Sequence, residues 1–504
     1  MPLGHRIYSP ECLSKYSSVG LTDFYGKIWK KCNGYFNYLV GITPKLGTAL
    51  EVISSESLKS IQELTPVQPY ALVFLYFSMT LPMLPFSQSN ECFWTGSVIS
   101  MAVPSSYNDV TQDKALRDHI GWAWYDRTFY VPVRWQTDKQ RVVLRLGSAH
   151  YNSIIYINGV AVTSHEGGHL PIMAEISSGL RFGKENLVTV AINNTLTPST
   201  LPQGKIVYHN DPTKYPPGYF EQTLDFDFFN YAGLHRPVYL YTTPQTYIDD
   251  IVVNTDIDGS AGIINYKIFA ATSGIGPQTE DNVGCSVKLL DNEGDHVTSA
   301  MGCVGTIKIS NASLWWPYLM HSNLAICYAA VSDEHGVLDL YPQKVGIRTL
   351  GWNSTTLTIN NRPLYLRGCG RHEDADIRGK GVDYPLIVKD FSLLKWLGAN
   401  SFRTSHYPYA EEIMDMADQE GIMIVDESPA IGLNGFGEEL MKRHIASCRN
   451  FRRDKNRPSV IMWSVGNEPK SYEPAAKEYF SSSFSETGWG IVAVYPEWKV
   501  ARDH

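Results

Sequence analysis

An Asn-Glu-Pro tripeptide ends the apolar stretch VIMWSVGNEP at residues 460–469. A glutamate at the end of a buried strand, beside an amide that can form hydrogen bonds, has the chemistry of a general acid/base. Glycosidases use such a carboxyl group together with a second carboxylate near the scissile bond. Glu468 is therefore the candidate acid/base, and its partner must be sought elsewhere in the sequence.

Three earlier segments also end on polar groups and alternate with helical patterns: LYLRGCGRHE (364–373), NSFRTSHYP (400–408) and IMIVDES (422–428). This βα alternation predicts parallel strands, whose carboxyl ends meet where a (β/α)₈ barrel builds its active site. The polar residues expected there are Arg371, His372, Glu373, Arg403, Ser405, His406, Asp426, Glu427, Asn467 and Glu468. The alternative for each is a structural ion pair, and for His406 we favour a buried, hydrogen-bonded role.

The intervening segments carry helix signals. Ile387, Phe391 and Leu394 recur at helical spacing before Gly398, and a second helix is expected over residues 410–420, ended by Gly421. Apolar residues at that spacing line one face of a helix, and glycine commonly follows a helix end.

Alternating apolar and polar runs precede this region. The first set predicts one β-sandwich and includes RVVLRLGSAH (141–150), NSIIYINGVAV (152–162) and LVTVAINNTL (187–196). Asn158-Gly159 is a hairpin signal. A second set follows a boundary near Thr243-Pro244 and includes YIDDIVVNTDI (247–257), INYKIFAATS (264–273) and GCSVKLLDNEG (284–294).

Composition excludes some classes of function. The chain has 504 residues, 43% of them hydrophobic, and a formal net charge of −8, which favours a globular protein without nucleic-acid binding. The eight cysteines show no C-x-x-C pair, so we expect neither a zinc site nor a disulfide framework. The run HEDAD at 372–376 lacks the H-E-x-x-H spacing, so we predict no metal site.

Targeting signals are weak. The first residues lack a signal-peptide pattern. Residues 70–86 are uncharged but interrupted by Pro82 and Pro85, which leaves a displaced signal-anchor or a buried segment as alternatives. N-x-S/T sequons occur at Asn193, Asn311 and Asn353.

Several longer motifs carry a family resemblance. They are GSAHYNSIIYINGV (147–160), DFFNYAGLHRPVYLYTTP (227–244), GRHEDADIRGKG (370–381), LGANSFRTSHYPYAEE (397–412), GIMIVDES (421–428) and WSVGNEP (463–469). Over about residues 95–480 the sequence resembles the β-glucuronidases of glycoside hydrolase family two, most closely those of animals.

The resemblance implies a multidomain fold. We expect a jelly-roll sugar-binding domain at 91–243, an immunoglobulin-like β-sandwich at 244–349 and the amino-terminal half of a (β/α)₈ TIM barrel at 350–480. Residues 1–90 and 481–504 are divergent segments to which we assign no role.

The resemblance also implies a retaining, cofactor-free hydrolase of β-D-glucuronides, including those at glycosaminoglycan ends. It implies a lysosomal homotetramer without firm membrane association. Glu468 matches the acid/base, Asn467 the residue that holds the sugar's 2-hydroxyl, and Asp227 and His372 the glycone pocket. One departure is small, because the family more often has alanine than glycine at the position of Gly466.

The second departure concerns the nucleophile. A retaining glycosidase needs a carboxylate ~5 Å from the acid/base. Glu486 imitates the family's nucleophile motif, yet it follows Glu468 by only 18 residues, and a βαβ unit takes ~30. Asp426 or Glu427 could serve as the base of an inverting mechanism, but we expect them to orient other residues.

We therefore predict that this chain lacks the nucleophile. Two hypotheses remain at this point: an incomplete β-glucuronidase, and a non-catalytic fragment that binds sugar or other subunits.

Overall fold

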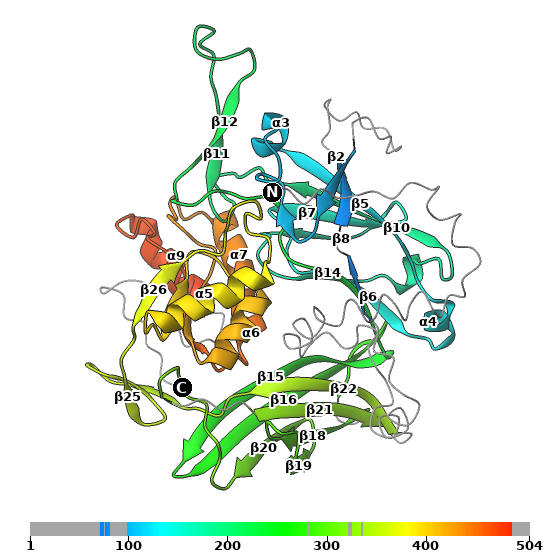
Figure 1. Ribbon diagram of the computed structural model, residues 1–504, viewed down its shortest axis with the longest axis vertical. Helices are drawn as coiled ribbons and strands as arrows, with labels where there is room; N and C mark the ends of the chain where they lie inside the picture. Colours follow the sequence, from blue (N-terminus) through cyan, green and yellow to red (C-terminus); the bar gives the residue numbers. More distant parts are fainter. Residues whose placement is uncertain are drawn as a thin grey trace, which may run out of the picture. The chain divides into compact units, whose positions relative to one another are not determined.

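Figure 1 shows the computed structural model of the chain, which describes residues 71–74, 76–80, 98–279, 282–320, 325–333 and 336–485. Along these residues antiparallel sheets come first, and a parallel sheet with helices follows. Among the described helices, none has the length and hydropathy needed to cross a membrane.

Two antiparallel sheets form the first β-sandwich, with strand orders β1-β14-β6-β9 and β3-β2-β5-β10-β7-β8. The strands are β1 (Ala71–Phe74), β2 (Tyr76–Thr80), β3 (Ile99–Ala102), β5 (Trp122–Tyr130), β6 (Arg141–Leu146), β7 (Asn152–Ile157), β8 (Val160–Glu166), β9 (Ile172–Glu175), β10 (Glu185–Asn193) and β14 (Val238–Thr243). Asn158 and Gly159 join β7 to β8 with positive φ values of 51° and 84°. Such angles define the tight hairpin turn that this dipeptide predicts, so the predicted hairpin is confirmed.

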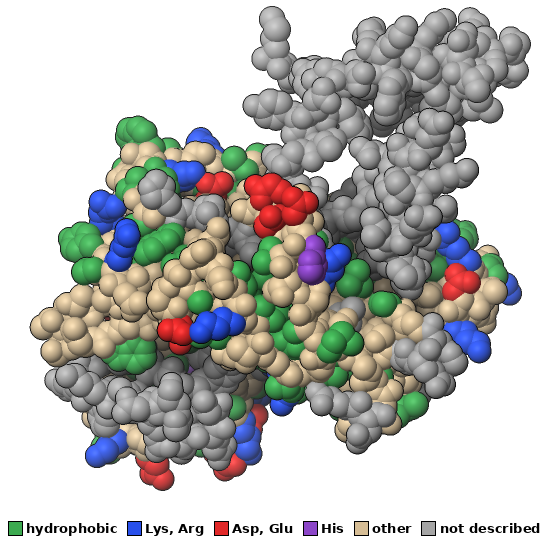
Figure 2. Space-filling model, turned by 90° about the horizontal axis from the view of Figure 1, so that it is seen from below, with side chains coloured by type: hydrophobic (Ala, Val, Ile, Leu, Met, Phe, Trp, Pro, Cys, Tyr) green, Lys and Arg blue, Asp and Glu red, His purple; other side chains and the backbone are tan. Residues whose placement is uncertain are grey.

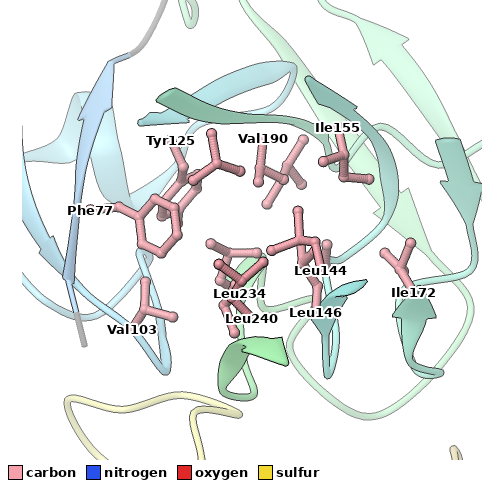
Figure 3. Packing of buried hydrophobic residues seen from close by; sticks show 14 of the residues in the cluster. Phe77, Val103, Tyr125, Leu144, Leu146, Ile155, Ile172, Val190, Leu234 and Leu240 are labelled. Carbon is pink, nitrogen blue, oxygen red and sulfur yellow. The ribbon is translucent and has the colours of Figure 1, made fainter. Parts of the chain in front are cut away.

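The first sandwich buries a continuous hydrophobic core between its sheets (Figure 3). Val190 from the six-stranded sheet and Leu240 from the four-stranded sheet belong to it, and Phe77 and Met79 on β2 are fully buried in the same core. The domain therefore includes β1 and β2, upstream of the boundary predicted at residue 91. The described part of the uncharged stretch 70–86 forms strands, because its apolar side chains complete this core.

A second sandwich follows. One of its sheets has the order β15-β16-β17 with β20 also paired to β16, and the other has the order β19-β18-β21-β22. The strands are β15 (Thr246–Asp258), β16 (Ala261–Thr272), β17 (Gly276–Pro277), β18 (Gly284–Leu290), β19 (His296–Met301), β20 (Val304–Ile309), β21 (Ala325–Asp333) and β22 (Gly336–Val345).

A disulfide bond joins Cys285 on β18 to Cys303 beside β20. The expectation of no disulfide is wrong for this pair. The two residues are 18 positions apart, so no short cysteine motif reveals them, and it is sheet packing that brings them together.

Shorter elements complete the antiparallel part and its connections. They are β4 (Ser105–Ser106), β11 (Gly204–Tyr208), β12 (Phe220–Leu224), β13 (Gly233–Leu234), β23 (Leu350–Trp352), β24 (Leu357–Ile359), β25 (Arg362–Leu364), α3 (Lys114–Arg117), α4 (Val133–Thr137) and the 3₁₀ helix η3 (Ser177–Gly179). The hairpin β11–β12 leads into the loop 225–232, which carries Asp227.

Four parallel strands form the last sheet of the described residues, in the order β26-β27-β28-β29. They are β26 (Gly368–Arg371), β27 (Ser401–Thr404), β28 (Met423–Glu427) and β29 (Val460–Ser464). The four strands predicted from the βα alternation are confirmed, and they are neighbours in chain order. Their carboxyl ends therefore meet at one edge of the sheet.

Within residues 336–485, five helices accompany this sheet: α5 (Tyr384–Trp396), α6 (Glu411–Glu420), α7 (Glu438–Ser447), α8 (Arg449–Asp454) and α9 (Pro474–Ser485). The side chain of Asp383 caps α5 by accepting a hydrogen bond from the backbone N–H of Leu386. The predicted apolar face of α5, Ile387, Phe391 and Leu394, is buried. Gly421 ends α6 with φ 70°, as the sequence predicts.

The surface in Figure 2 mixes charges of both signs with hydrophobic side chains, and one group of acidic side chains stands together. Across the described residues on that face, we see no continuous basic surface of the kind that phosphate backbones require.

Candidate active site

The carboxyl edge of the parallel sheet gathers the predicted polar residues. His372 follows β26, His406 follows β27, Glu427 ends β28 and Asn467 follows β29. This convergence results from parallel pairing, because each strand delivers its last residues to the same edge.

Backbone contacts fix the Asn467-Glu468 pair. The N–H of Asn467 donates to the carbonyl of Ala430 at 2.8 Å, and the N–H of Gly432 donates to the carbonyl of Asn467 at 2.9 Å. Glu468 has φ 44° and an exposed side chain. A left-handed conformation is uncommon for glutamate, and such residues cluster at functional sites. The segment thus holds this carboxyl group out of the sheet and open to a ligand.

Arg403 connects Asn467 to a buried carboxylate. Its guanidinium donates to Oδ1 of Asn467 at 3.3 Å, and its Nε lies 3.6 Å from Oε2 of Glu427. The side chain of Arg403 is 40% exposed, whereas that of Glu427 is 1% exposed. The buried carboxylate of Glu427 therefore orients Arg403, which in turn holds the side-chain amide of Asn467 beside Glu468.

Glu427 is surrounded by hydrogen-bond donors. Its side chain accepts hydrogen bonds from Nδ1 of His406 at 3.0 Å and from the hydroxyl of Ser464 at 2.7 Å. Its backbone N–H donates to Oγ1 of Thr404 at 2.8 Å. A buried carboxylate with this set of partners is suited to holding its neighbours in place.

Asp426 is fully buried and accepts a hydrogen bond from Thr404 at 3.1 Å. Burial, followed by the charge of Asp454, raises the pKa of Asp426 to about 7. Its carboxyl group is out of contact with solvent.

Asp227 reaches this edge from the first sandwich. One of its carboxylate oxygens lies 3.4 Å from Nε2 of His406, and donor atoms of Asp227, His372 and His406 all lie within 4.8 Å of one another. Nδ1 of His372 is 3.2 Å from the hydroxyl of Tyr407. Burial lowers the pKa of His372 and Asp374 opposes that shift, so burial favours the neutral imidazole. The structure thus brings the sequence-predicted residues Asp227 and His372 together.

Comparison with known proteins identifies the family. Residues 96–244 match the family model described as glycosyl hydrolases family 2, sugar binding domain, and residues 352–483 match the TIM barrel domain model of that family. The solved β-D-glucuronidase of Dictyoglomus thermophilum is similar to this chain, with TM-score 0.76 and 38% identity, covering 83% of this chain and 70% of that one. This chain belongs to glycosyl hydrolase family 2. The resemblance found in the sequence is confirmed.

Other family 2 relatives agree. The β-glucuronidase of Ruminococcus gnavus, solved in complex with C6-substituted uronic isofagomine, has TM-score 0.76 and 37% identity, covering 84% of this chain and 71% of that one. The β-glucuronidase of Felis catus is 49% identical over 406 residues, and that of Homo sapiens is 48% identical over 407. Each match covers 78% of this chain and 61% of the relative, so the chain spans about three fifths of the length of these curated relatives.

The sequence did not reveal the residues that hold the loop 225–232, which carries Asp227. Nε2 of His150 lies 2.9 Å from Oδ1 of Asn230, and Lys470 forms an ion pair with Asp225 at 3.1 Å. These contacts tie the loop 225–232 to the first sandwich at one end and to the segment after Glu468 at the other. His150 and Asn230 lie inside quoted family motifs, but no local pattern pairs these residues, because their partners are distant in sequence.

Lys380 was also missed, although it stands inside the family motif at 370–381. It is buried, and its ammonium lies 3.5 Å from the ring centre of Tyr407 and 4.5 Å from that of Phe228. Burial lowers the pKa of Lys380 to about 7. Lys380 packs under the two aromatic rings that contact His372.

Glu486, which spacing rejects as a nucleophile, lies outside the described residues.

Proposed function

We propose that this chain carries the sugar-binding surface and the acid/base carboxyl of a β-glucuronidase that hydrolyses β-D-glucuronides with retention. The supporting observation is the Asn467-Glu468 pair at the carboxyl edge, with the carboxyl group of Glu468 exposed and the amide of Asn467 held by Arg403. Family 2 membership and the β-glucuronidase relatives add to this support.

The proposed roles follow from position. Glu468 protonates the glycosidic oxygen and then removes a proton from the attacking water. Asn467 receives the sugar's 2-hydroxyl, and Asp227 and His372 line the glycone pocket from two different domains. Glu427 positions Arg403 and His406 through its buried contacts.

Neither Asp426 nor Glu427 suits the part of the second carboxylate. Asp426 is fully buried and Glu427 is 1% exposed, with hydrogen bonds to His406 and Ser464. We therefore propose that the nucleophile, which must stand ~5 Å from Glu468, is not among the described residues. The 504-residue chain by itself should leave an aryl β-glucuronide uncleaved.

The same proposal extends to the finer fold. We assign the two sandwiches to a jelly-roll and an immunoglobulin-like domain, and β26–β29 to the first half of a (β/α)₈ barrel. Apolar side chains at the end of α5 support further packing there, since Trp396 and Leu397 are 79% and 70% exposed. The neighbouring helix of a closed barrel would cover such a face.

For the cell, we propose a lysosomal enzyme that forms homotetramers and acts on glucuronides, including those at glycosaminoglycan ends. Two observations fit the secretory route that leads there. The Cys285–Cys303 disulfide suits an oxidising compartment. The sequon residues Asn311 and Asn353 are exposed, as glycosylation requires.

The test supplies a second carboxylate to the described barrel strands. The residues of the Felis catus enzyme that follow the counterpart of residue 485 would be joined after residue 485, and cleavage of an aryl β-glucuronide would be measured. We expect activity in the joined protein and none in the 504-residue chain.

Glu468→Gln in the joined protein should lower kcat by ~10²–10⁴-fold on a substrate with a poor leaving group. Glu438→Gln, an exposed residue on α7, is the matched control and should leave kcat unchanged. A joined protein that folds and cleaves normally with Gln at position 468 would refute the assignment. A folded but inactive joined protein would favour the alternative, a non-catalytic fragment that binds sugar or subunits.

A further inference from the structure

Three side chains with metal-binding atoms converge beside the candidate acid/base. Asp227 comes from the loop of the first sandwich, His372 from the end of β26 and His406 from the end of β27. Their donor atoms all lie within 4.8 Å of one another. From the spacing within HEDAD at 372–376 we predicted no metal site, whereas the structure combines one residue of that run with two distant residues.

The distances suit a small divalent ion. Zinc binds imidazole nitrogen and carboxylate oxygen at about 2.0–2.2 Å, so two ligand atoms of a tetrahedral site lie about 3.3 Å apart. Nε2 of His406 and the oxygen of Asp227 are 3.4 Å apart. Asp227 is 74% exposed, so its side chain is free to rotate toward His372. Two imidazoles and one carboxylate are a ligand set that zinc, copper and cobalt prefer over magnesium or calcium.

Surrounding groups orient the two imidazoles as such a site requires. Glu427 accepts the hydrogen bond from Nδ1 of His406 at 3.0 Å, which leaves Nε2 facing Asp227. The hydroxyl of Tyr407 lies 3.2 Å from Nδ1 of His372, which leaves the other ring nitrogen available. Carboxylate partners of this kind fix the tautomer of metal-bound histidines and raise their basicity.

A divalent ion bound between Nε2 of His406 and the carboxylate of Asp227 would take His372 as its third ligand.

We propose that Asp227, His372 and His406 form a binding site for Zn²⁺ or a similar divalent transition-metal ion, and that the ion and a glucuronide exclude each other. The mutual exclusion rests on the proposed function, because in that function Asp227 and His372 bind the sugar. The binding itself depends only on the three side chains.

The experiment titrates ZnCl₂ into the tag-free 504-residue chain by calorimetry, and CoCl₂ with detection of the visible absorption of four-coordinate cobalt. We expect one ion per chain. Asp227→Asn, which keeps the shape of an exposed side chain, and His372→Gln should each weaken binding at least tenfold. Glu427→Gln, which removes the negative charge beside Nδ1 of His406, should weaken it about 10–100-fold. Thermal melting of each variant checks that it is folded.

Two controls exclude other metal ligands. Cys369 is an exposed free thiol on β26, and His209 pairs with Glu221 on the β11–β12 hairpin. Cys369→Ser and His209→Gln should leave binding unchanged. The absence of saturable binding, or binding that survives in a folded Asp227→Asn or His372→Gln variant, would overturn the site. Loss of binding in Cys369→Ser would also overturn it, because the ion would then be bound by a thiolate.

Competition is measured separately, by repeating the zinc titration with D-glucuronic acid present. We expect weaker apparent zinc binding. Unchanged zinc affinity, in a protein shown to bind the sugar, would overturn the mutual exclusion. Zinc binding in a protein whose joined form lacks glucuronidase activity would refute the proposed function and leave the metal site standing.

Discussion

Arg236→Met should loosen the attachment of the first sandwich to the strand–helix domain. Arg236 is 3% exposed and donates hydrogen bonds to the carbonyls of His169 at 2.6 Å and Pro408 at 2.7 Å. Its Nη2 lies 3.3 Å from Oε1 of Glu373, whose side chain is 4% exposed. The other oxygen of Glu373 accepts the N–H of Ala410 at 2.9 Å. This pair therefore joins residues of two domains immediately beside His372.

The expected loss of stability follows from the polar groups that methionine leaves without a partner. Removing one partner of a buried ion pair costs about 3–5 kcal/mol, because the remaining charge is uncompensated. Two backbone carbonyls also lose a donor, at about 1–3 kcal/mol for each acceptor left unsatisfied. These penalties overlap, since the same rearrangement relieves all of them, so we expect a loss of about 3–5 kcal/mol in the free energy of unfolding at pH 7.

Urea unfolding followed by tryptophan fluorescence measures this loss. The double variant with Glu373→Gln should recover part of it, because the side chain that has lost its guanidinium partner is then uncharged. Lys308→Met is the control, since it breaks the pair with Asp258 whose side chains are 60% and 67% exposed, and it should leave the transition unchanged. A loss below about 1 kcal/mol for Arg236→Met, or an undiminished loss in the double variant, would refute the reasoning.

Three further predictions concern other parts of the structure. Burial lowers the pKa of His150 from 6.5 to about 3, so the unfolded chain binds more protons between those values and stability falls as pH falls through that window. From about pH 7.5 to about pH 4.5 the melting temperature should fall less in His150→Gln than in the natural chain. An equal fall in both proteins would contradict the assignment. Cys303→Ser should lower the free energy of unfolding, measured in urea, by about 3 kcal/mol, because the disulfide closes a loop of 18 residues. Dithiothreitol should destabilise the natural chain but not the variant. A fragment of residues 69–349 should melt cooperatively. A fragment of residues 95–349 should be less stable, by at least the ~3–5 kcal/mol expected for loss of the fully buried Phe77. Equal melting of the two fragments would show that β2 is dispensable.

The sequence by itself determined the elements of the strand–helix domain and the part of the first sandwich that follows residue 98. Side-chain period and turn chemistry are local, so Ile387, Phe391 and Leu394 predict the buried face of α5, and Asn158-Gly159 predicts a hairpin, without knowledge of any partner. The polar strand ends were equally visible, because parallel strands must deliver them to one edge. The family motifs predicted the acid/base residue and the residues of the glycone pocket.

Only the tertiary structure decided which distant groups share a contact. The strands at residues 71–80 lack a decisive pattern, and it is their pairing with β14, β5 and β3 that assigns them to the sandwich. Cys285 and Cys303 meet through sheet packing, and Asp227 reaches His406 because a loop of one domain is held against another. Such contacts depend on packing between segments far apart in the chain, and the free energy that fixes them resides in no single segment.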